Sequence, residues 1–408
     1  MSRAISYGRQ TIDGDDVEAV VRALTSEKIT QGPLVEEFES ELSRRTGARY
    51  AVACSSGTAA LHLAYLAAGV GNGDGVVTSP ITFLASANAA IYAGATPLFA
   101  DIDPATSNID PQEVEKTLSF NSNIKTLVPV HFAGLACDME SISRIASARG
   151  LTVIEDACHA LGAEWKTGDG RWVKVGACTH SDMTVFSFHP VKSITTAEGG
   201  AVTTNDERLY RRLKTLRSHG VTREKTELVH GEGSPWYYEM HELGFNYRLS
   251  DIQSALGISQ LKKLDNFMRR RSEIAAIYST ALSKYPFIKT PFEGPGTKSA
   301  RHLYPITVEF GEIGVSRKEL FELMSNIGIN LQVHYIPVHL QPYYRKKFGY
   351  RPGDFPKAEA FYTKEVSLPI YPLLTDEEAG AVTAALISTL GCASAKTGSR
   401  RAVDRACL

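Results

Sequence analysis

Lys192 is the residue whose surroundings in this sequence most favour covalent chemistry. It follows a short run of apolar and β-branched residues, Met183 to Phe188, which predicts a buried strand, and Pro190 interrupts the regular structure. The lysine is therefore expected in a loop between two core strands. Its apolar neighbours in the sequence are Phe186, Phe188, Val191 and Ile194. Apolar surroundings disfavour the ammonium form and lower the pKa of a lysine, which makes it a nucleophile toward aldehydes.

A second chemical candidate is the acid that ends another apolar run. Thr152 to Glu155 is expected to be a buried strand, and Asp156 follows it directly. A carboxylate at a strand end can serve a catalytic crevice, or it can simply cap or salt-bridge the strand. His159 lies three residues further on, and a single histidine is most often a structural residue.

A third candidate is the segment CSSGTAA, residues 54–60, at the junction of a predicted strand and a predicted helix. Ser56, Gly57 and Thr58 would present backbone N–H groups and the positive end of the helix dipole to an anion. The same residues also make an ordinary helix cap. Alone, this segment therefore indicates only a possible phosphate site.

The segment FSFHPVKSITTAEGGAVTTND resembles the cofactor-binding segment of the DegT/DnrJ/EryC1/StrS family, sugar aminotransferases that use pyridoxal 5'-phosphate. The resemblance implies that Lys192 forms the Schiff base and that Ser187, together with Ser56, Gly57 and Thr58, binds the cofactor phosphate. It also implies that Asp156 pairs with the pyridine nitrogen, keeping the ring an electron sink, and that His159 faces the ring.

This chain departs from the family pattern at one small residue. Ala197 stands where many relatives have glycine, which bears on the local loop geometry. A dehydratase branch of the family has histidine at the lysine position, and Lys192 argues against that branch.

Further residues gain a role only through the resemblance. Phe83, by default a core aromatic, would stack on the other face of the cofactor ring. In GFNYRLSD, residues 244–251, Asn246 would reach the cofactor phosphate of a neighbouring subunit, which implies a homodimer with shared active sites. Tyr247 and Arg248 would bind substrate, since an arginine can hold a carboxylate or phosphate with two hydrogen bonds, although Arg248 can equally be a surface residue.

The segment VHYIPVHLQPYYR, residues 333–345, is unusually rich in histidine and tyrosine, and His334 and Tyr335 are predicted to bind substrate. This segment, together with SDMTVFSFHPVK at residues 181–192, resembles the branch that makes a UDP-linked 4-amino-4,6-dideoxy sugar for pseudaminic acid synthesis. The resemblance therefore implies transfer of an amino group from L-glutamate to C4 of a UDP-linked 4-keto-6-deoxy-N-acetyl sugar. The alternatives are another nucleotide-sugar C3 or C4 aminotransferase, a 3-dehydratase and a non-catalytic regulator that binds the cofactor.

The elements that must position these residues are predicted to form an α/β fold. Seven short apolar strands alternate with amphipathic helices, which predicts a mostly parallel, doubly wound sheet with its ligands at the carboxyl ends of the strands. The resemblance adds the fold-type I architecture, with a smaller α+β domain at the C-terminal end. The predicted strands are 50–54, 76–79, 97–100, 126–130, 152–155, 183–186 and 201–204.

The predicted domains are a large cofactor-binding domain, 1–255, a small domain, 256–392, and a disordered tail that begins at residue 393. A helix at 13–25, with Val17, Val20, Val21 and Leu24 on one face, is predicted near the start of the large domain, and a long helix at 249–285 is predicted to connect the two domains. Strands at 302–308, 332–335 and 365–368 and helices at 317–327 and 376–390 are predicted in the small one.

Composition limits the remaining function classes. The chain has 408 residues, a formal charge of -1 and 43% hydrophobic residues, which is typical of an ordinary globular protein and gives no basic excess for nucleic-acid binding. The six cysteines form no C-x-x-C pair, so we expect reduced thiols and no metal site. No signal peptide or membrane span is indicated, and a cytoplasmic location is expected.

Overall fold

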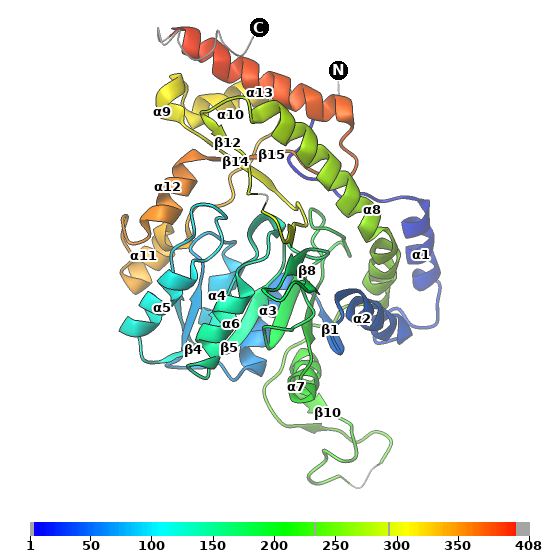
Figure 1. Cartoon of the computed structure of the whole chain (residues 1–408). Coiled ribbons are helices and arrows are strands. Elements are labelled where there is room, and N and C mark those ends of the chain that lie inside the picture. The colour runs from blue at the N-terminus through cyan, green and yellow to red at the C-terminus, as the bar shows by residue number, and fades with distance from the viewer. Residues whose placement is uncertain (1–3, 232–233, 293, 397–408) are drawn as a thin grey trace.

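A seven-stranded sheet forms the centre of the computed structural model, which describes residues 4–231, 234–292 and 294–396 (Figure 1). The strands are β1 (Tyr50–Cys54), β2 (Gly75–Thr78), β3 (Thr96–Phe99), β4 (Ile124–Val128), β5 (Thr152–Asp156), β8 (Met183–Ser187) and β9 (Gly200–Thr204). Their order is β1-β9-β8-β5-β4-β2-β3, and β9 is antiparallel to both of its neighbours while the rest run in one direction. The predicted α/β fold with a mostly parallel sheet is confirmed.

Both faces of this sheet are buried, which explains why its strands read as continuous apolar runs. In β1, Ala51 and Ala53 belong to one core cluster, whereas Val52 and Cys54 belong to another on the opposite face. The first cluster includes side chains of α2 (Pro33–Thr46), α5 (Pro111–Phe120), α6 (Met139–Ser147) and α8 (Asp251–Leu282). The second includes α3 (Gly57–Ala67), α4 (Ala85–Tyr92) and α7 (Glu207–Arg217).

Helix α8 links this layered body to a smaller unit. Ser250 caps the helix through a capping box with Gln253, so the chain enters α8 with its first backbone donors satisfied. Residues of α8 up to Phe267 pack in the large core, and those from Ile274 onward pack in a separate cluster that extends to Leu390. The division of the chain into 1–255 and 256–392 remains a prediction, and α8 spans it.

The smaller unit combines an antiparallel sheet with helices. Its strands are β12 (Ile288–Lys289), β14 (Tyr304–Val308) and β15 (Glu365–Leu368), and its core takes side chains from α10 (Arg317–Asn326) and α13 (Asp376–Lys396). The short helix α9 (Phe310–Ile313) also contributes to this core. Two further helices, α11 (Pro342–Phe348) and α12 (Pro356–Lys364), pack against the large body, where Tyr344 clusters with Ala87 and Phe99 and the Ala358 N–H donates to Asp101. A small separate sheet pairs β6 (Glu164–Lys166) with β7 (Trp172–Lys174) and β13 (Thr297–Lys298).

The predicted helix at 13–25 is confirmed as α1 (Gly14–Leu24), in which Val17, Val21 and Leu24 are each more than half exposed and Ala23 is buried. Two expectations need correction. Residues 332–335 are not a strand, since only Gln332 pairs with β15, in an isolated bridge to Ser367. Helix α13 continues to Lys396, so residues 393–396 of the predicted tail are helical, and residues 397–408 lie outside the described part of the chain.

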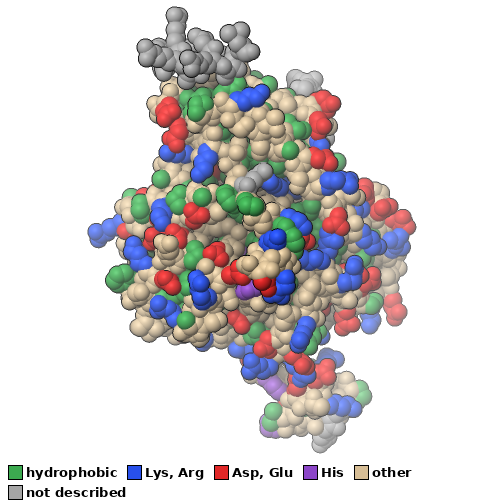
Figure 2. All heavy atoms as spheres, viewed as in Figure 1, with side chains coloured by type: hydrophobic (Ala, Val, Ile, Leu, Met, Phe, Trp, Pro, Cys, Tyr) green, Lys and Arg blue, Asp and Glu red, His purple; other side chains and the backbone are tan. Residues whose placement is uncertain are grey.

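A long arm between α7 and α8 leaves the body of the molecule. It contains the short pair β10 (Val221–Thr222) and β11 (Glu239–Met240), and Figures 1 and 2 show it projecting below α7, at the foot of both views. Large apolar side chains are exposed along it, namely Val229, Trp236, Tyr238, Met240 and Leu243. Among the described residues, no helix combines the length and apolar composition that crossing a membrane requires.

Candidate active site

A cavity of about 510 Å³ lies where the parallel strands of the central sheet end. Most of the predicted site residues line it, although they come from distant parts of the sequence and from both the large body and the smaller unit. These residues are Ser56, Gly57, Thr58, Phe83, Asp156, His159, Ser187, Lys192, His334 and Tyr335.

The start of α3 forms one wall of this cavity. Ser56 is the N-cap of α3, and its Oγ accepts a hydrogen bond from the Ala59 N–H at 3.1 Å. The ordinary helix-capping role that the sequence allowed for this residue is therefore present. The N–H groups of Gly57 and Thr58 have no partner within the helix, as is usual for a first turn, and both residues line the cavity. The helix therefore offers its positive end to an anion in the cavity.

Ser187, at the end of β8, is in direct contact with this helix start. A Cβ atom on Gly57 would lie 2.8 Å from Ser187 Cβ and 3.1 Å from its Oγ. One on Gly200 would lie 2.4 Å from the Ser56 carbonyl oxygen. Glycine is thus required at two positions for β8, β9 and α3 to approach one another, and this approach places Ser187 beside Gly57 and Thr58.

Asp156 is the last residue of β5, and it is buried at the cavity wall. Its Oδ2 accepts a hydrogen bond from Ser86 Oγ at 2.6 Å, and its Oδ1 accepts one from the Cys158 N–H at 3.2 Å. These two donors fix the orientation of the carboxylate. Ser86, which comes from the first turn of α4, was not predicted as a site residue, because no motif surrounds it in the sequence.

Lys192 lies in the loop between β8 and β9 and lines the same cavity. Desolvation lowers the pKa of its ammonium group, while the nearby Cys158 and Asp156 act in the opposite direction. Of the four apolar neighbours expected from the sequence, only Val191 lines the cavity, because Phe186, Phe188 and Ile194 are buried in the core of the large body. The lysine is therefore desolvated by the cavity as a whole.

Three histidines from different elements surround this lysine. Tyr335 and His159 share a hydrogen bond of 3.0 Å between the phenol oxygen and Nε2, and the His302 ring lies 4.5 Å from that of His159. Burial, followed by the charge of Lys192, lowers the pKa of His159, His302 and His334, the last to about 3. These imidazoles are therefore neutral at physiological pH. His302 was not predicted, since it stands alone in the sequence.

Phe83 is not a core aromatic. Its side chain is 58% exposed, it lines the cavity, and its ring centroid lies 6.3 Å from that of Tyr335. The ring is thus available to stack on a planar ligand.

Asn246, Tyr247 and Arg248 do not line the cavity of their own chain. Asn246 is exposed, and its backbone pairs with Ser218 in an isolated bridge. Tyr247 stacks on Phe245 with ring centroids 4.9 Å apart, and its hydroxyl lies 3.3 Å from His62 Nδ1. Arg248 is half-buried beside them. A direct part for these three residues in catalysis therefore requires a second subunit.

The residues of the cavity fit pyridoxal phosphate. The helix start and Ser187 provide a phosphate site, Asp156 provides a carboxylate, and Lys192 provides a desolvated amine. His159 Nδ1 and His302 Nδ1 are buried without a hydrogen-bond partner among the described residues, as expected of polar atoms that await a ligand. When bound, the cofactor would supply an electron sink for removal of a proton from the substrate carbon.

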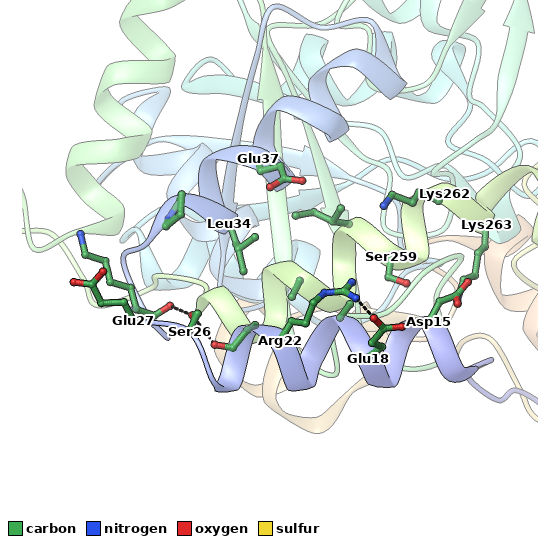
Figure 3. Close-up of a pocket in the computed structure, with 16 residues that line it drawn as sticks. Asp15, Glu18, Arg22, Ser26, Glu27, Leu34, Glu37, Ser259, Lys262 and Lys263 are labelled. Carbon is green, nitrogen blue, oxygen red and sulfur yellow. Dashed lines mark hydrogen bonds and ion pairs between the residues drawn. The ribbon is translucent and has the colours of Figure 1, made fainter.

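A larger hollow of about 1090 Å³ lies elsewhere, between α1, α2 and α8 (Figure 3). It contains none of the predicted site residues, and charged side chains dominate it. Arg22 pairs with Glu18 along α1, and Lys263 of α8 pairs with Asp16 at 2.9 Å. Because none of the predicted catalytic or cofactor-binding residues lines this groove, it does not resemble the catalytic centre that the sequence predicts.

Comparison with known proteins agrees with the geometry. The family model described as the DegT/DnrJ/EryC1/StrS aminotransferase family matches residues 10–387. The chain is 42% identical to the spore coat polysaccharide biosynthesis protein SpsC of Bacillus subtilis, over 92% of this chain and 94% of that protein. It is 41% identical to the UDP-4-amino-4,6-dideoxy-N-acetyl-beta-L-altrosamine transaminase of Campylobacter jejuni, over 95% of this chain and 97% of that protein.

A solved structure supports the same assignment. The aminotransferase PseC of Helicobacter pylori, involved in the biosynthesis of pseudaminic acid, superimposes with a TM-score of 0.87 at 34% identity, covering 96% of this chain and 100% of that one. The fold is therefore that of the fold-type I transferases. The chain belongs to the DegT/DnrJ/EryC1/StrS aminotransferase family and is an aminotransferase that depends on pyridoxal phosphate.

Proposed function

We propose that this aminotransferase moves the amino group of L-glutamate to C4 of a UDP-linked 4-keto-6-deoxy-N-acetyl sugar. The product would be UDP-4-amino-4,6-dideoxy-N-acetyl-β-L-altrosamine. The observation that carries the proposal is the convergence of Lys192, Asp156 and the α3 terminus in one cavity, which His334 and Tyr335 also line. The named transaminase of Campylobacter jejuni, similar over 95% of this chain, supports the choice of sugar.

Each residue of the cavity has a task in this reaction. Lys192 would hold the cofactor, and its amine would take a proton from the substrate carbon and return one. Asp156 would keep the cofactor ring cationic, and Ser86 would hold Asp156 in place. Phe83 and His159 would face the ring, while His334 and Tyr335 would contact the sugar. The keto acid would leave before the keto sugar enters, which gives ping-pong kinetics.

We also propose that the enzyme is a homodimer with shared active sites. Asn246 is exposed and lies outside its own cavity, and the arm that precedes it carries Trp236, Met240 and Leu243 on its surface. The apolar side of α1 is exposed as well. Apolar surfaces of this kind are typical of protein interfaces, and a second copy would bring Asn246 to a cavity. The cytoplasmic location stays a prediction.

The main alternative is an aminotransferase of the same family that acts on a different nucleotide sugar, at C3 or C4. The similarity to a spore coat polysaccharide protein supports this alternative. A 3-dehydratase is disfavoured, because a lysine stands at position 192 in the cavity where the dehydratase branch carries histidine.

The cofactor assignment can be tested by borohydride reduction and peptide mass mapping of the purified protein. The cofactor mass is expected on the peptide that contains Lys192, and Lys192→Ala should lose it together with at least about 10³-fold of the activity. Lys289→Ala, at an exposed lysine of β12, is the matched control and should behave as wild type. Retained labelling and turnover in Lys192→Ala would contradict the assignment.

The substrate assignment needs a separate assay. L-glutamate and other amino acids are compared as donors, and UDP- and dTDP-linked 3-keto and 4-keto sugars as acceptors, with the products identified by NMR. Amination at C4 of the UDP-linked keto sugar is expected, and preferred amination at C3 or of a dTDP sugar would favour the alternative.

A further inference from the structure

Three buried polar side chains form a continuous line that ends at the active-site cavity. Glu365 and Ser367 lie two residues apart on β15, so their side chains share one face of the strand. Ser367 Oγ is 2.6 Å from Glu365 Oε1 and 2.8 Å from His334 Nδ1. His334 in turn lines the cavity. The line therefore connects a carboxyl group in the core of the smaller unit with an imidazole in the active site.

The geometry of this line is fixed by the main chain. The His334 N–H donates to Glu365 Oε2 at 2.9 Å, and Gln332 and Ser367 exchange backbone hydrogen bonds of 2.8 and 3.2 Å. Since Nδ1 is engaged by Ser367, Nε2 is the His334 nitrogen that remains for a group in the cavity. Among the described residues, nothing else accepts from or donates to Nε2.

The charged groups around the line are few. Glu365 is fully buried, and the Arg317 guanidinium near it donates to the Glu365 and Tyr362 carbonyl oxygens rather than to the carboxylate. Burial raises the pKa of Glu365 to about 8, while Ser367, the His334 N–H and Arg317 act in the opposite direction. Lys192, His159, His302, Tyr7 and Tyr335 surround the His334 ring.

We propose that Glu365, Ser367 and His334 form a proton relay that lets His334 Nε2 take up or give up a proton in the cavity while the imidazole stays neutral. When a proton arrives at Nε2, the Nδ1 proton passes to Ser367 Oγ, and the hydroxyl proton of Ser367 passes to Glu365 Oε1. In the reverse direction the same three protons move back. No oxidant or other reactant is needed, and the net result is one proton moved between the cavity and Glu365.

The relay solves a problem that the cavity creates. Burial and the nearby Lys192 disfavour an imidazolium at His334, so this histidine cannot store a proton by itself near neutral pH. Glu365 can store one, because its carboxyl group changes charge close to that range. On the proposed function, the proton would serve the oxygen that leaves C4 of the keto sugar, and His334 would act beside Lys192 rather than in its place.

The relay can be tested without cofactor or substrate. In protein labelled with ¹⁵N-histidine, the shifts of His334 Nδ1 and Nε2 report which nitrogen carries the proton. Raising the pH through about 8 is expected to move the proton from Nε2 to Nδ1. Glu365→Gln and Ser367→Ala should both abolish this exchange. A wild-type tautomer that is unchanged from pH 6 to pH 10, or one that changes equally in both variants, would overturn the relay.

A kinetic test then separates a catalytic part from a structural one. Ser367→Ala is expected to lower kcat of the sugar half-reaction by about 10²-fold with little change in KM, and Ser367→Thr, which keeps the hydroxyl, should restore most of it. The L-glutamate half-reaction should change by less than about threefold. Ser279→Ala is the matched control. This substitution also removes a hydroxyl group that forms a hydrogen bond, here of 2.7 Å with Tyr304, and it lies in the smaller unit away from the cavity.

Equal losses in both half-reactions, or a loss in Ser279→Ala as large as in Ser367→Ala, would overturn the catalytic part of the relay. Failure of every UDP-linked keto sugar as an acceptor would contradict the proposed function instead. The NMR experiment distinguishes the two, since it depends on neither substrate.

Discussion

At the scale of single residues, the cavity brings together a carboxylate, an amine and three imidazoles, and a different environment sets the charge of each kind of group. Asp156 is buried but keeps two hydrogen-bond donors, Ser86 and the Cys158 N–H. Lys192 is partly desolvated, and the carboxylate of Asp156 counteracts the resulting fall of its pKa. The three histidines are neutral because burial and Lys192 disfavour their imidazolium forms. A cofactor phosphate would therefore meet a helix terminus and hydroxyl groups rather than histidine cations.

Glu365 gives a pH prediction at this scale. Its pKa is raised in the folded protein from an ordinary 4.5 to about 8, so between these values the folded chain holds a proton that the unfolded chain has released. Stability then falls with rising pH in that window, because the free energy of unfolding decreases wherever the folded state binds more protons. Glu365→Gln removes this contribution. Its urea midpoint, relative to wild type, should therefore rise between pH 5 and pH 8.

Glu309→Gln serves as the matched control for that measurement. Glu309 is partly exposed and paired with Lys364 at 2.7 Å, so its loss should shift the midpoint by a small amount with little pH dependence. Parallel pH profiles for wild type and Glu365→Gln would show that Glu365 does not titrate abnormally.

At the scale of elements, the loop between β8 and β9 positions the lysine through a compact set of backbone bonds. The Lys192 N–H donates to the His189 carbonyl at 2.9 Å, and the Phe188 N–H donates to the Gly199 carbonyl at 2.8 Å. Ala197 has a φ of +65°, in the left-handed region that favours glycine. The departure from glycine noted in the sequence is therefore a site of backbone strain.

Ala197→Gly should relieve that strain. A left-handed conformation costs an L-residue about 1 to 2 kcal/mol, and part of the gain is offset by the greater freedom of glycine in the unfolded chain. The free energy of unfolding should rise by roughly 0.5 to 1 kcal/mol, measured by urea titration. Ala105→Gly is the control, an exposed loop alanine outside the left-handed region, and it should lose about 0.5 kcal/mol. Equal decreases in the free energy of unfolding of the two variants would contradict the conclusion that the backbone at Ala197 is strained.

At the scale of the whole molecule, the proposed dimer makes each site depend on two chains. Lys192 lines the cavity of its own chain, whereas Asn246 does not. If Asn246 acts in the partner's site, a heterodimer of Lys192→Ala with Asn246→Ala chains contains one intact site and one doubly altered site. Each variant alone contains none.

Subunit exchange between the two variants tests this arrangement. Equal amounts should regain roughly a quarter of the wild-type activity, because half of the dimers are mixed and each carries one intact site. Sedimentation should give twice the chain mass of 44.5 kDa. Mixing Lys192→Ala with Asp156→Ala is the control. Both residues line the cavity of their own chain, so a mixed dimer has no intact site and its activity should stay at the level of the single variants. If mixing restores activity with neither pair, Asn246 does not act in the partner's site.

The sequence by itself determined the parts of this protein whose signals are local. Strands buried on both faces must be apolar throughout, so the sheet could be predicted almost residue by residue. Asp156 ends a strand, Lys192 and the start of α3 each follow one, and the carboxyl ends of parallel strands meet at one edge of a sheet. The convergence of these residues in one cavity was therefore predictable.

Only the tertiary structure decided the rest. The periodicity of α1 revealed an apolar stripe but not which surface covers it, and that stripe is exposed on the single chain. Ser86, His302 and Glu365 are isolated polar residues without a motif. Ser86 and His302 gain a role because other elements place them in the cavity, and Glu365 gains one because Ser367 connects it to His334. Burial and the proximity of charges are properties of the folded chain, so no local sequence pattern could have predicted the roles of these residues.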